Sequence, residues 1–395
     1  MRKIQPRAIS FCLFAAVLLT VFAVSCQPEP DRFKSFEAAP SHPTEIQEAY
    51  ISVQAASAHS ENTVSAALAY AQNQKAEATA TPQKKVELVP VTFGNTTYYR
   101  LNGSNYMIRK PVIEDQSIKS MIKARADQML QIQAAHPDIP IYIYMVVRAT
   151  DMDWYADAQG GIKAYNYAPY FQSLIAGNPK IKFDYFKMPD LQYYEDTGYK
   201  TDFHVNYKGS YQVYQDIYQM MAGDLGLSPM LVPEKTLDFD NLLFCGALLS
   251  ADDVKPYVQN LPEDAEDVFK AYAFNYGSYT EYLENKRMIL GLEDEYAAGQ
   301  INRDLFFNHQ FSYYGGQAGL IQIKFDHPDK PNLLMLSDSQ GRPSRRQIAY
   351  HFNNTVFLDD VETRSMDLEQ VIQDYDIGVI LLVGQVSMFE VYETN

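Results

Sequence analysis

The chain has 395 residues and a net charge of −16, with 47% hydrophobic and 13% aromatic residues. This apolar content can form a large core, so we expect one big α/β domain with an insertion, or two domains. The acidic balance offers no basic stripe to a phosphate backbone, and we therefore expect no nucleic-acid partner.

Residues 1–25 have the pattern of an export signal. Three basic residues fall within the first seven positions, and an apolar run follows at 11–24 that is short for a membrane span. The run ends in Ala-Val-Ser-Cys, which resembles a bacterial lipobox and makes Cys26 the expected lipidation site. The alternative is an ordinary secretory signal cut nearby. We predict an exported cell-envelope protein held to the membrane by its lipid anchor only.

Residues 26–85 are predicted to connect this signal to the folded domain. Positions 27–40 have the composition of a flexible tether. Positions 43–83 are rich in Ala, Gln, Glu and Ser with a weak helical rhythm, which predicts one or two helices in a stalk. Disorder is the alternative for this segment.

Residues 86–225 are predicted to form the first part of the main domain. Short alternating runs separated by Gly and Asn predict hairpin strands at 86–92, 97–101 and 106–109. Helical and strand patterns then alternate, with helices at 113–135, 165–176 and 207–222 and strands at 140–147 and 181–186. Such alternation is typical of a parallel sheet covered by helices.

Residues 226–330 interrupt this alternation and are predicted to be an insertion or cap of mixed structure. The alternation resumes over residues 331–395, with strands at 332–336, 355–358 and 377–383 and helices at 343–352 and 366–375. Five strands of this kind predict an α/β fold with a flavodoxin-like three-layer α/β/α arrangement. Ligands of such open sheets bind at the carboxyl ends of the strands.

The loop before the 207–222 helix places a carboxylate two residues before an imidazole, in Asp202-Phe203-His204. Such a pair can supply two members of a hydrolytic triad, in which Asp202 orients His204 and His204 takes a proton from a nucleophile. The alternative is that Asp202 only caps the following helix.

The nucleophile candidate is Ser339, at the end of a buried-strand run that closes with Ser337-Asp338-Ser339. The turn precedes a predicted helix, so its backbone N–H groups could bind an oxyanion. The alternative is that Ser339 is only an N-terminal residue of that helix.

These two motifs resemble those of the DHHW family of secreted bacterial proteins and of the SGNH-hydrolase-like proteins that O-acetylate alginate. Residues 199–204 with Gly209 match the Asp-x-His block, and residues 333–339 match the later serine block, in the same order. The resemblance covers roughly residues 95–390. The chain departs from the pattern at Phe203 and Val205, which replace His and Trp, and in the residues that follow Ser339.

The resemblance implies an acyl-ester enzyme, either an O-acetyltransferase or an esterase. Ser339 would attack an acyl carbonyl, with Gly341 or the amide of Gln385 completing the oxyanion hole. The implied substrate is a polysaccharide or acylated carbohydrate, and the implied protein partner is a membrane-bound acyl-transfer protein. The alternative is a catalytically silent lipoprotein that binds glycan or a partner through the aromatic-rich insertion.

Other reactive side chains have weaker patterns. His309 lies near a Gly-Gly turn and could line the pocket, although a surface position is the alternative. Cys245 stands in an apolar run and is predicted to be buried and inert. The sequence contains no Gly-rich phosphate loop, no His-Glu-x-x-His and no Cys-x-x-Cys, so neither a cofactor nor a metal is predicted.

Overall fold

The computed structural model describes residues 88–93, 96–101, 105–108, 112–148, 165–250, 254–260, 265–283, 296, 298–315, 320–359 and 366–389. The predicted signal peptide, Cys26 and the tether to residue 85 lie outside these residues. Within the described part, no helix has the length and apolar character needed to cross a bilayer.

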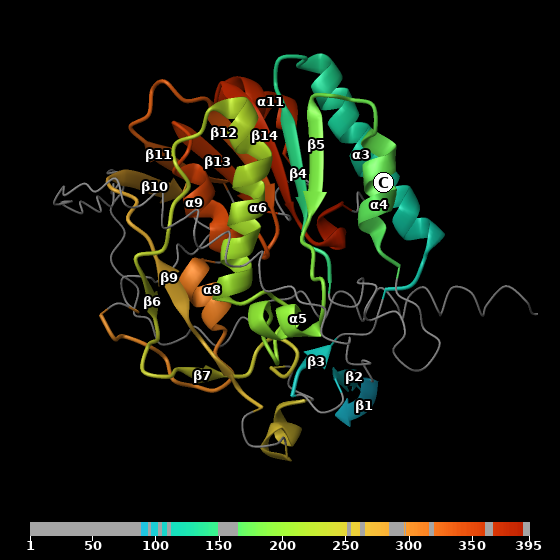
Figure 1. The fold of residues 1–395 in the computed structure, drawn as a ribbon, viewed down its shortest axis with the longest axis vertical. Helices are drawn as coiled ribbons and strands as arrows, with labels where there is room; N and C mark the ends of the chain where they lie inside the picture. The colour runs from blue at the N-terminus through green and yellow to red at the C-terminus, as the bar shows by residue number, and fades with distance from the viewer. Residues whose placement is uncertain are drawn as a thin grey trace, which may run out of the picture. The chain divides into compact units, whose positions relative to one another are not determined.

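A mostly parallel sheet forms the centre of this α/β fold (Figure 1). Its parallel strands are β4 (Ile141–Met145), β5 (Ile181–Tyr185), β12 (Asn332–Ser337), β13 (Asn354–Asp359) and β14 (Ile377–Gly384). All five fall where the sequence predicted strands. Most of their side chains are buried, as expected for parallel strands covered on both faces.

The order of these strands in space shows how the chain is wound. Their neighbours run β13-β12-β14-β4-β5 across the sheet. If β12 is numbered first and β13, β14, β4 and β5 follow it, the five strands stand in the order 2-1-3-4-5 across the sheet. The first two parallel strands of the chain thus occupy the last two places of that order. The Asp-x-His motif follows β5 and therefore precedes the serine motif, which follows β12.

The sheet has two further strands from within the segment predicted as an insertion. Strand β11 (Leu320–Phe325) pairs antiparallel with β13, and β10 (Tyr279–Leu283) pairs antiparallel with β11. Among the described residues, the central sheet therefore has seven strands, where the sequence predicted five. The prediction missed β10 because its sequence, Tyr-Thr-Glu-Tyr-Leu, lacks the apolar run of a buried parallel strand.

Helices α3 (Gln116–Ala135), α4 (Tyr167–Ile175), α6 (Tyr207–Leu225) and α11 (Leu368–Asp374) confirm the predicted helices. In Figure 1, α6 crosses the near face of the sheet, and α3 and α4 lie together beside β5. Helix α6 ends at Gly226, whose positive φ of 55° suits a glycine C-cap. The helix predicted at 343–352 is shorter: a 3-10 turn, η4 (Arg342–Ser344), leads into α9 (Arg345–Ala349).

The smaller elements lie mostly on the side of the sheet at which β4 and β5 end, with β1, β2, β3 and α5 nearest to these ends (Figure 1). They are the antiparallel sheet β1 (Leu88–Phe93), β2 (Thr96–Leu101) and β3 (Met107–Ile108), the helices α5 (Leu191–Thr197) and α8 (His309–Tyr314), the 3-10 helices η3 (Lys255–Asn260) and η5 (Val386–Phe389), and the pairs β6 (Lys235–Leu237) with β9 (Ala271–Ala273) and β7 (Leu243–Phe244) with β8 (Asp267–Val268). The Met107 N–H donates to the Lys200 carbonyl over 2.7 Å, which ties β3 to the loop that carries Asp202.

Candidate active site

Asp202 and His204 form a compact hydrogen-bonded pair on the loop before α6. Asp202 Oδ1 accepts from the His204 backbone N–H over 2.9 Å and lies 2.6 Å from His204 Nδ1. Asp202 is 4% exposed. Burial raises the pKa of Asp202, but His204 and two backbone N–H groups more than offset this and leave its pKa lowered. An ionised Asp202 can only accept, so the Nδ1 nitrogen of His204 carries the proton.

The other ring nitrogen of His204 faces the serine candidate. His204 Nε2 lies 2.8 Å from Ser339 Oγ, although the two residues are 135 positions apart in the chain. Since Nδ1 holds the proton, Nε2 is the acceptor for the Ser339 hydroxyl. The ring of Phe203 stacks on the imidazole, with 4.2 Å between their centroids. Asp202, His204 and Ser339 therefore form one continuous hydrogen-bonded chain.

Neither Asp202 nor Ser339 caps a helix, so the structural alternatives from the sequence are wrong. Helix α6 is capped by Asn206, whose side chain accepts from the N–H groups of Lys208 and Gly209. The N-cap of η4 is Gly341.

The turn that carries Ser339 is fastened by Asp338. The two carboxylate oxygens of Asp338 accept the N–H groups of Gln340 and Gln385, each over 2.8 Å. Gln385 follows the end of β14, so Asp338 joins the ends of two neighbouring strands. A Cβ at Gly341 would lie 2.1 Å from Ser337 Oγ, so a larger residue there would force Ser337 or the turn to shift.

Residues of the predicted insertion form hydrogen bonds with Asp202 and with the loop that carries it. The Ala247 N–H donates to Asp202 Oδ2 over 2.8 Å, and the Gly246 N–H donates to Thr201 Oγ1 over 2.8 Å. Asp267 in turn accepts the N–H groups of Lys200 and Thr201, each over 2.7 Å. Burial raises the pKa of Asp267 to about 6 despite these hydrogen bonds. Sequence reasoning missed this support, because no local pattern links residues 45 to 67 positions apart.

Gly246 offers a test of how closely Asp202 must be held. A Cβ at this position would lie 2.4 Å from the Asp202 Cβ and 2.6 Å from its Oδ2, so Gly246→Ala must displace the carboxylate. If the chain has the acyl-ester activity expected from its motifs, Gly246→Ala should lower turnover roughly 10²-fold, because a displacement of about 1 Å at a reacting group can cost that much. Gly223→Ala on α6 is the matched control, since nothing lies within 4 Å of its added carbon. Equal activity in both variants would show that Asp202 tolerates displacement.

A pocket opens beside His204, at the carboxyl ends of β4 and β14. Its apolar wall consists of Met107, Ile108, Val146, Val147, Met188, Phe203, Val205 and Leu248. Its polar side includes Arg148, Asp202, His204, Gln340 and Gln385. The Gln340 side-chain amide is buried, and neither its Nε2 nor its Oε1 has a hydrogen-bond partner among the described residues. Sequence reasoning did not single out Gln340.

Of the other predicted pocket residues, Gln385 lines the pocket, whereas Gly341 and His309 do not. Gln385 lines the pocket, but its backbone N–H is already donated to Asp338. Gly341 does not line the pocket, and its N–H donates to the Asp338 carbonyl over 3.3 Å. His309 does not line it either; its Nδ1 lies 2.6 Å from the Tyr296 hydroxyl, and burial lowers its pKa to about 4. His309 is buried, so a surface position is wrong as well.

Cys245 and possible metal ligands complete the inventory of reactive groups. Cys245 is buried as predicted, and burial raises the pKa of its thiol to about 12, which keeps it protonated. Within the part of the chain that the structure describes, no group of three or more His, Cys, Asp or Glu side chains is placed to hold a metal ion.

Comparison with solved structures defines the fold. Bacillus cereus PatB1 aligns with a TM-score of 0.56 at 15% identity, over 77% of this chain and 98% of that one. A DHHW family protein from Eubacterium siraeum aligns with a TM-score of 0.53 at 14% identity, over 78% and 96%. The chain shares their fold. The resemblance to DHHW proteins inferred from the two motifs is therefore matched by the structure at the level of fold.

Two other comparisons bear on this result. PatB1 carrying a sulfonyl adduct aligns with a TM-score of 0.54 at 16% identity, over 77% of this chain and 96% of that one. The O-acetyltransferase domain of Pseudomonas putida AlgJ aligns at 7% identity, over 73% and 90%, and its TM-score of 0.41 adds no support for a shared fold. No protein-family model and no curated protein matches the sequence.

Proposed function

We propose that this protein is an exported, lipid-anchored acyl-ester enzyme of the SGNH type, with a flavodoxin-like three-layer α/β/α domain. The observation that supports this most directly is the hydrogen-bonded chain from Asp202 through His204 to Ser339. It lies beside a pocket at the carboxyl ends of parallel strands, where open α/β sheets bind their ligands.

In the proposed reaction, Ser339 Oγ attacks an acyl carbonyl while its proton passes to His204 Nε2. Asp202 stabilises the imidazolium that forms. The same proton then goes to the departing alcohol, which leaves an acyl ester on Ser339. A water molecule or a sugar hydroxyl next gives its proton to His204 and attacks this ester, which releases the free acid or the acylated sugar and restores Ser339.

The oxyanion of each tetrahedral intermediate needs at least two donors. We propose the Ser339 backbone N–H and the Gln340 side-chain amide, because Gln340 lines the pocket and its amide has no partner among the described residues. This replaces the donors expected from Gly341 and Gln385, whose N–H groups are used by Asp338.

The acyl acceptor we propose is a hydroxyl of a cell-surface polysaccharide. The apolar wall of the pocket suits a short acyl chain such as acetyl, and its polar side suits a carbohydrate. Anchoring through Cys26 would keep the site at the membrane surface, within reach of a membrane-bound acyl-transfer protein that supplies the acyl group.

The test is an acetyl-transfer assay with the purified chain, p-nitrophenyl acetate and an oligosaccharide acceptor. We expect p-nitrophenolate release together with an acetylated oligosaccharide, detected by mass spectrometry; release without sugar acetylation would identify an esterase. A parallel incubation with phenylmethylsulfonyl fluoride should label Ser339. If neither turnover nor labelling of Ser339 occurs, the enzyme proposal fails and a glycan- or partner-binding lipoprotein becomes the better account.

A further inference from the structure

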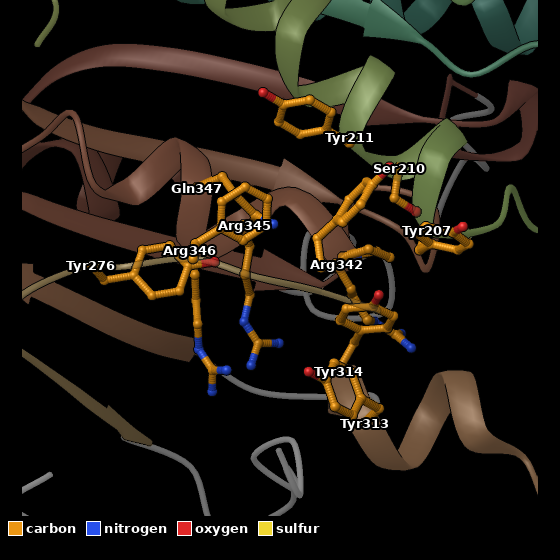
Figure 2. A pocket seen from close by; sticks show the side chains of 13 residues that line it. Tyr207, Ser210, Tyr211, Tyr276, Tyr313, Tyr314, Arg342, Arg345, Arg346 and Gln347 are labelled. Atoms are coloured by element: carbon orange, nitrogen blue, oxygen red, sulfur yellow. The ribbon is translucent and has the colours of Figure 1, made fainter. Parts of the chain in front are cut away.

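The loop before α6 is held at its C-terminal end by the helix itself. Asn206 caps α6, and its side-chain amide also donates to the Gly198 carbonyl over 2.9 Å. Figure 2 shows Tyr207 and Ser210 of the first turn of α6 beside a pocket that residues of η4 and α9 also line. Asp202 lies at the other end of this loop, so its position depends on a different set of contacts.

Asp267 of β8 holds that other end. Its Oδ1 accepts the Lys200 N–H and its Oδ2 accepts the Thr201 N–H, each over 2.7 Å. The Thr201 hydroxyl donates to the same Oδ2. Asp267 is 4% exposed and Thr201 is 0% exposed, so water does not compete for these hydrogen bonds. Three donors from the two residues that precede Asp202 therefore converge on one buried carboxylate.

The Thr201 hydroxyl extends this connection to the turn that bonds Asp202. It accepts the Gly246 N–H over 2.8 Å, and the next N–H group, that of Ala247, donates to Asp202 Oδ2 over 2.8 Å. Gly246 follows β7 by two residues, and β7 pairs with the strand that carries Asp267. Asp267 thus fixes both the loop that carries Asp202 and the position of that loop against the turn.

We propose that Asp267 is a positioning residue for the triad, which as a carboxylate holds Asp202 against His204 and on protonation releases the loop. This inference rests on the proposed acyl-ester activity and adds a pH dependence to it. The two backbone N–H groups that face Asp267 can only donate. A protonated oxygen would turn its own hydrogen toward such a donor, so at least one of the hydrogen bonds to Lys200 or Thr201 must break.

The loss of the carboxylate falls in an accessible pH range, because burial raises the pKa of Asp267 to about 6. Three other titratable groups face Asp267 and stay protonated in this range because burial raises their pKa: Tyr106, Tyr199 and Cys245. Asp202, whose pKa is lowered, stays ionised. The nearest charged neighbours in the chain are Lys200 and Glu266, and the Lys200 ammonium donates to the Glu266 backbone carbonyl over 3.4 Å.

The experiment compares p-nitrophenyl acetate turnover by the wild type and by Asp267→Asn from about pH 5 to about pH 8. Asparagine cannot accept at both positions, so the variant resembles the protonated wild type at every pH. At the upper pH we expect a turnover number lower by about tenfold or more, with KM nearly unchanged. The ratio of wild-type to variant turnover should fall toward one as the pH drops through about 6. Titration of His204 affects both proteins and cancels in this ratio, so a ratio that is constant with pH would overturn the proposal.

Asp238→Asn is the matched control. Asp238 is an exposed carboxylate of the same segment that accepts the Asn241 N–H over 2.8 Å, and this variant should follow the wild type at every pH. If Asp267→Asn does not fold, Thr201→Val removes one donor to Asp267 together with the acceptor of the Gly246 N–H. It should lower turnover several-fold, and Thr201→Ser, which keeps the hydroxyl, should restore it. Wild-type turnover in Thr201→Val would also overturn the proposal.

Proton NMR separates this inference from the proposed activity. The His204 Nδ1 proton, bonded to Asp202, should give a downfield signal that is assigned by its loss in His204→Ala. At about pH 8, Asp267→Asn should shift or broaden this signal, and Asp238→Asn should not. If the wild type does not turn over the ester, the enzyme proposal fails, and an altered signal in Asp267→Asn would still support the positioning role. An identical signal in the wild type and Asp267→Asn would overturn that role.

Discussion

Ser339→Ala is expected to lower acyl-ester turnover at least about 10³-fold and to abolish labelling by phenylmethylsulfonyl fluoride. This substitution removes the hydroxyl that lies 2.8 Å from His204 Nε2. Of the three hydrogen-bonded residues Asp202, His204 and Ser339, only Ser339 can form an acyl ester. His204→Ala should cause a loss of similar size, because a serine without its base is a weak nucleophile. The loss in the double variant should be close to that in either single one, since the two residues act as a unit.

The matched control is Ser173→Ala. Ser173 is an exposed serine on α4 whose hydroxyl bonds only to the Tyr170 carbonyl among the described contacts. It should retain full turnover and full labelling. Turnover of p-nitrophenyl acetate by Ser339→Ala at the wild-type rate would reject Ser339 as nucleophile, even if His204→Ala were inactive.

The sequence was sufficient to predict the parallel strands, because a strand buried on both faces of a sheet requires a continuous apolar run. Leu333 to Leu336 and Val379 to Val383 are such runs, and both became inner strands. Edge strands lack this signature. Strand β10 contains Glu281, whose charge is paired with two arginines from α9 that lie more than 60 positions away. Only the folded chain reveals why this edge strand can hold a glutamate with a buried side chain.

The helix expected at 343–352 shows how tertiary contacts set an element's length. The segment begins with the 3-10 turn at Arg342, and the α-helical residues end at Ala349. The Asn353 N–H donates to the Pro331 carbonyl, because β13 begins at Asn354 and must pair with β12. The register of the sheet therefore decides where this helix stops, and helix propensity alone could not locate that point.

The candidate site was predicted from two local motifs, and the structure brings these motifs together. The sequence could not identify the residues that surround these motifs and hold them in place. Ala247 and Asp267 belong to a segment whose composition suggests only an irregular insertion, yet they hold the loop that carries Asp202. His309 illustrates the opposite error, because a histidine near a glycine turn was expected at the pocket or the surface and instead pairs with Tyr296 in the core.

Asp202→Asn is expected to lower the turnover number by about 10⁴-fold while leaving KM nearly unchanged. An asparagine that turns its NH₂ group toward Nδ1 favours the wrong tautomer, in which His204 Nε2 holds the proton and cannot take one from Ser339. It also removes the negative charge that stabilises the imidazolium. Because the side chains are nearly equal in size, the hydrogen bond from Ala247 to the second oxygen can persist and the loop can keep its shape.

The decisive comparison is with Asp367→Asn. Asp367 caps α11 by accepting from the N–H groups of Glu369 and Gln370, and asparagine is an equally good N-cap, so this variant should keep wild-type activity.

The folded state lowers the pKa of Asp202, so its carboxylate contributes stability above its unfolded pKa, and that contribution is lost as the pH falls through the folded value. Urea unfolding at neutral pH should therefore show lower stability for Asp202→Asn. A variant that is less stable at neutral pH yet fully active would assign Asp202 a structural role and remove it from the triad.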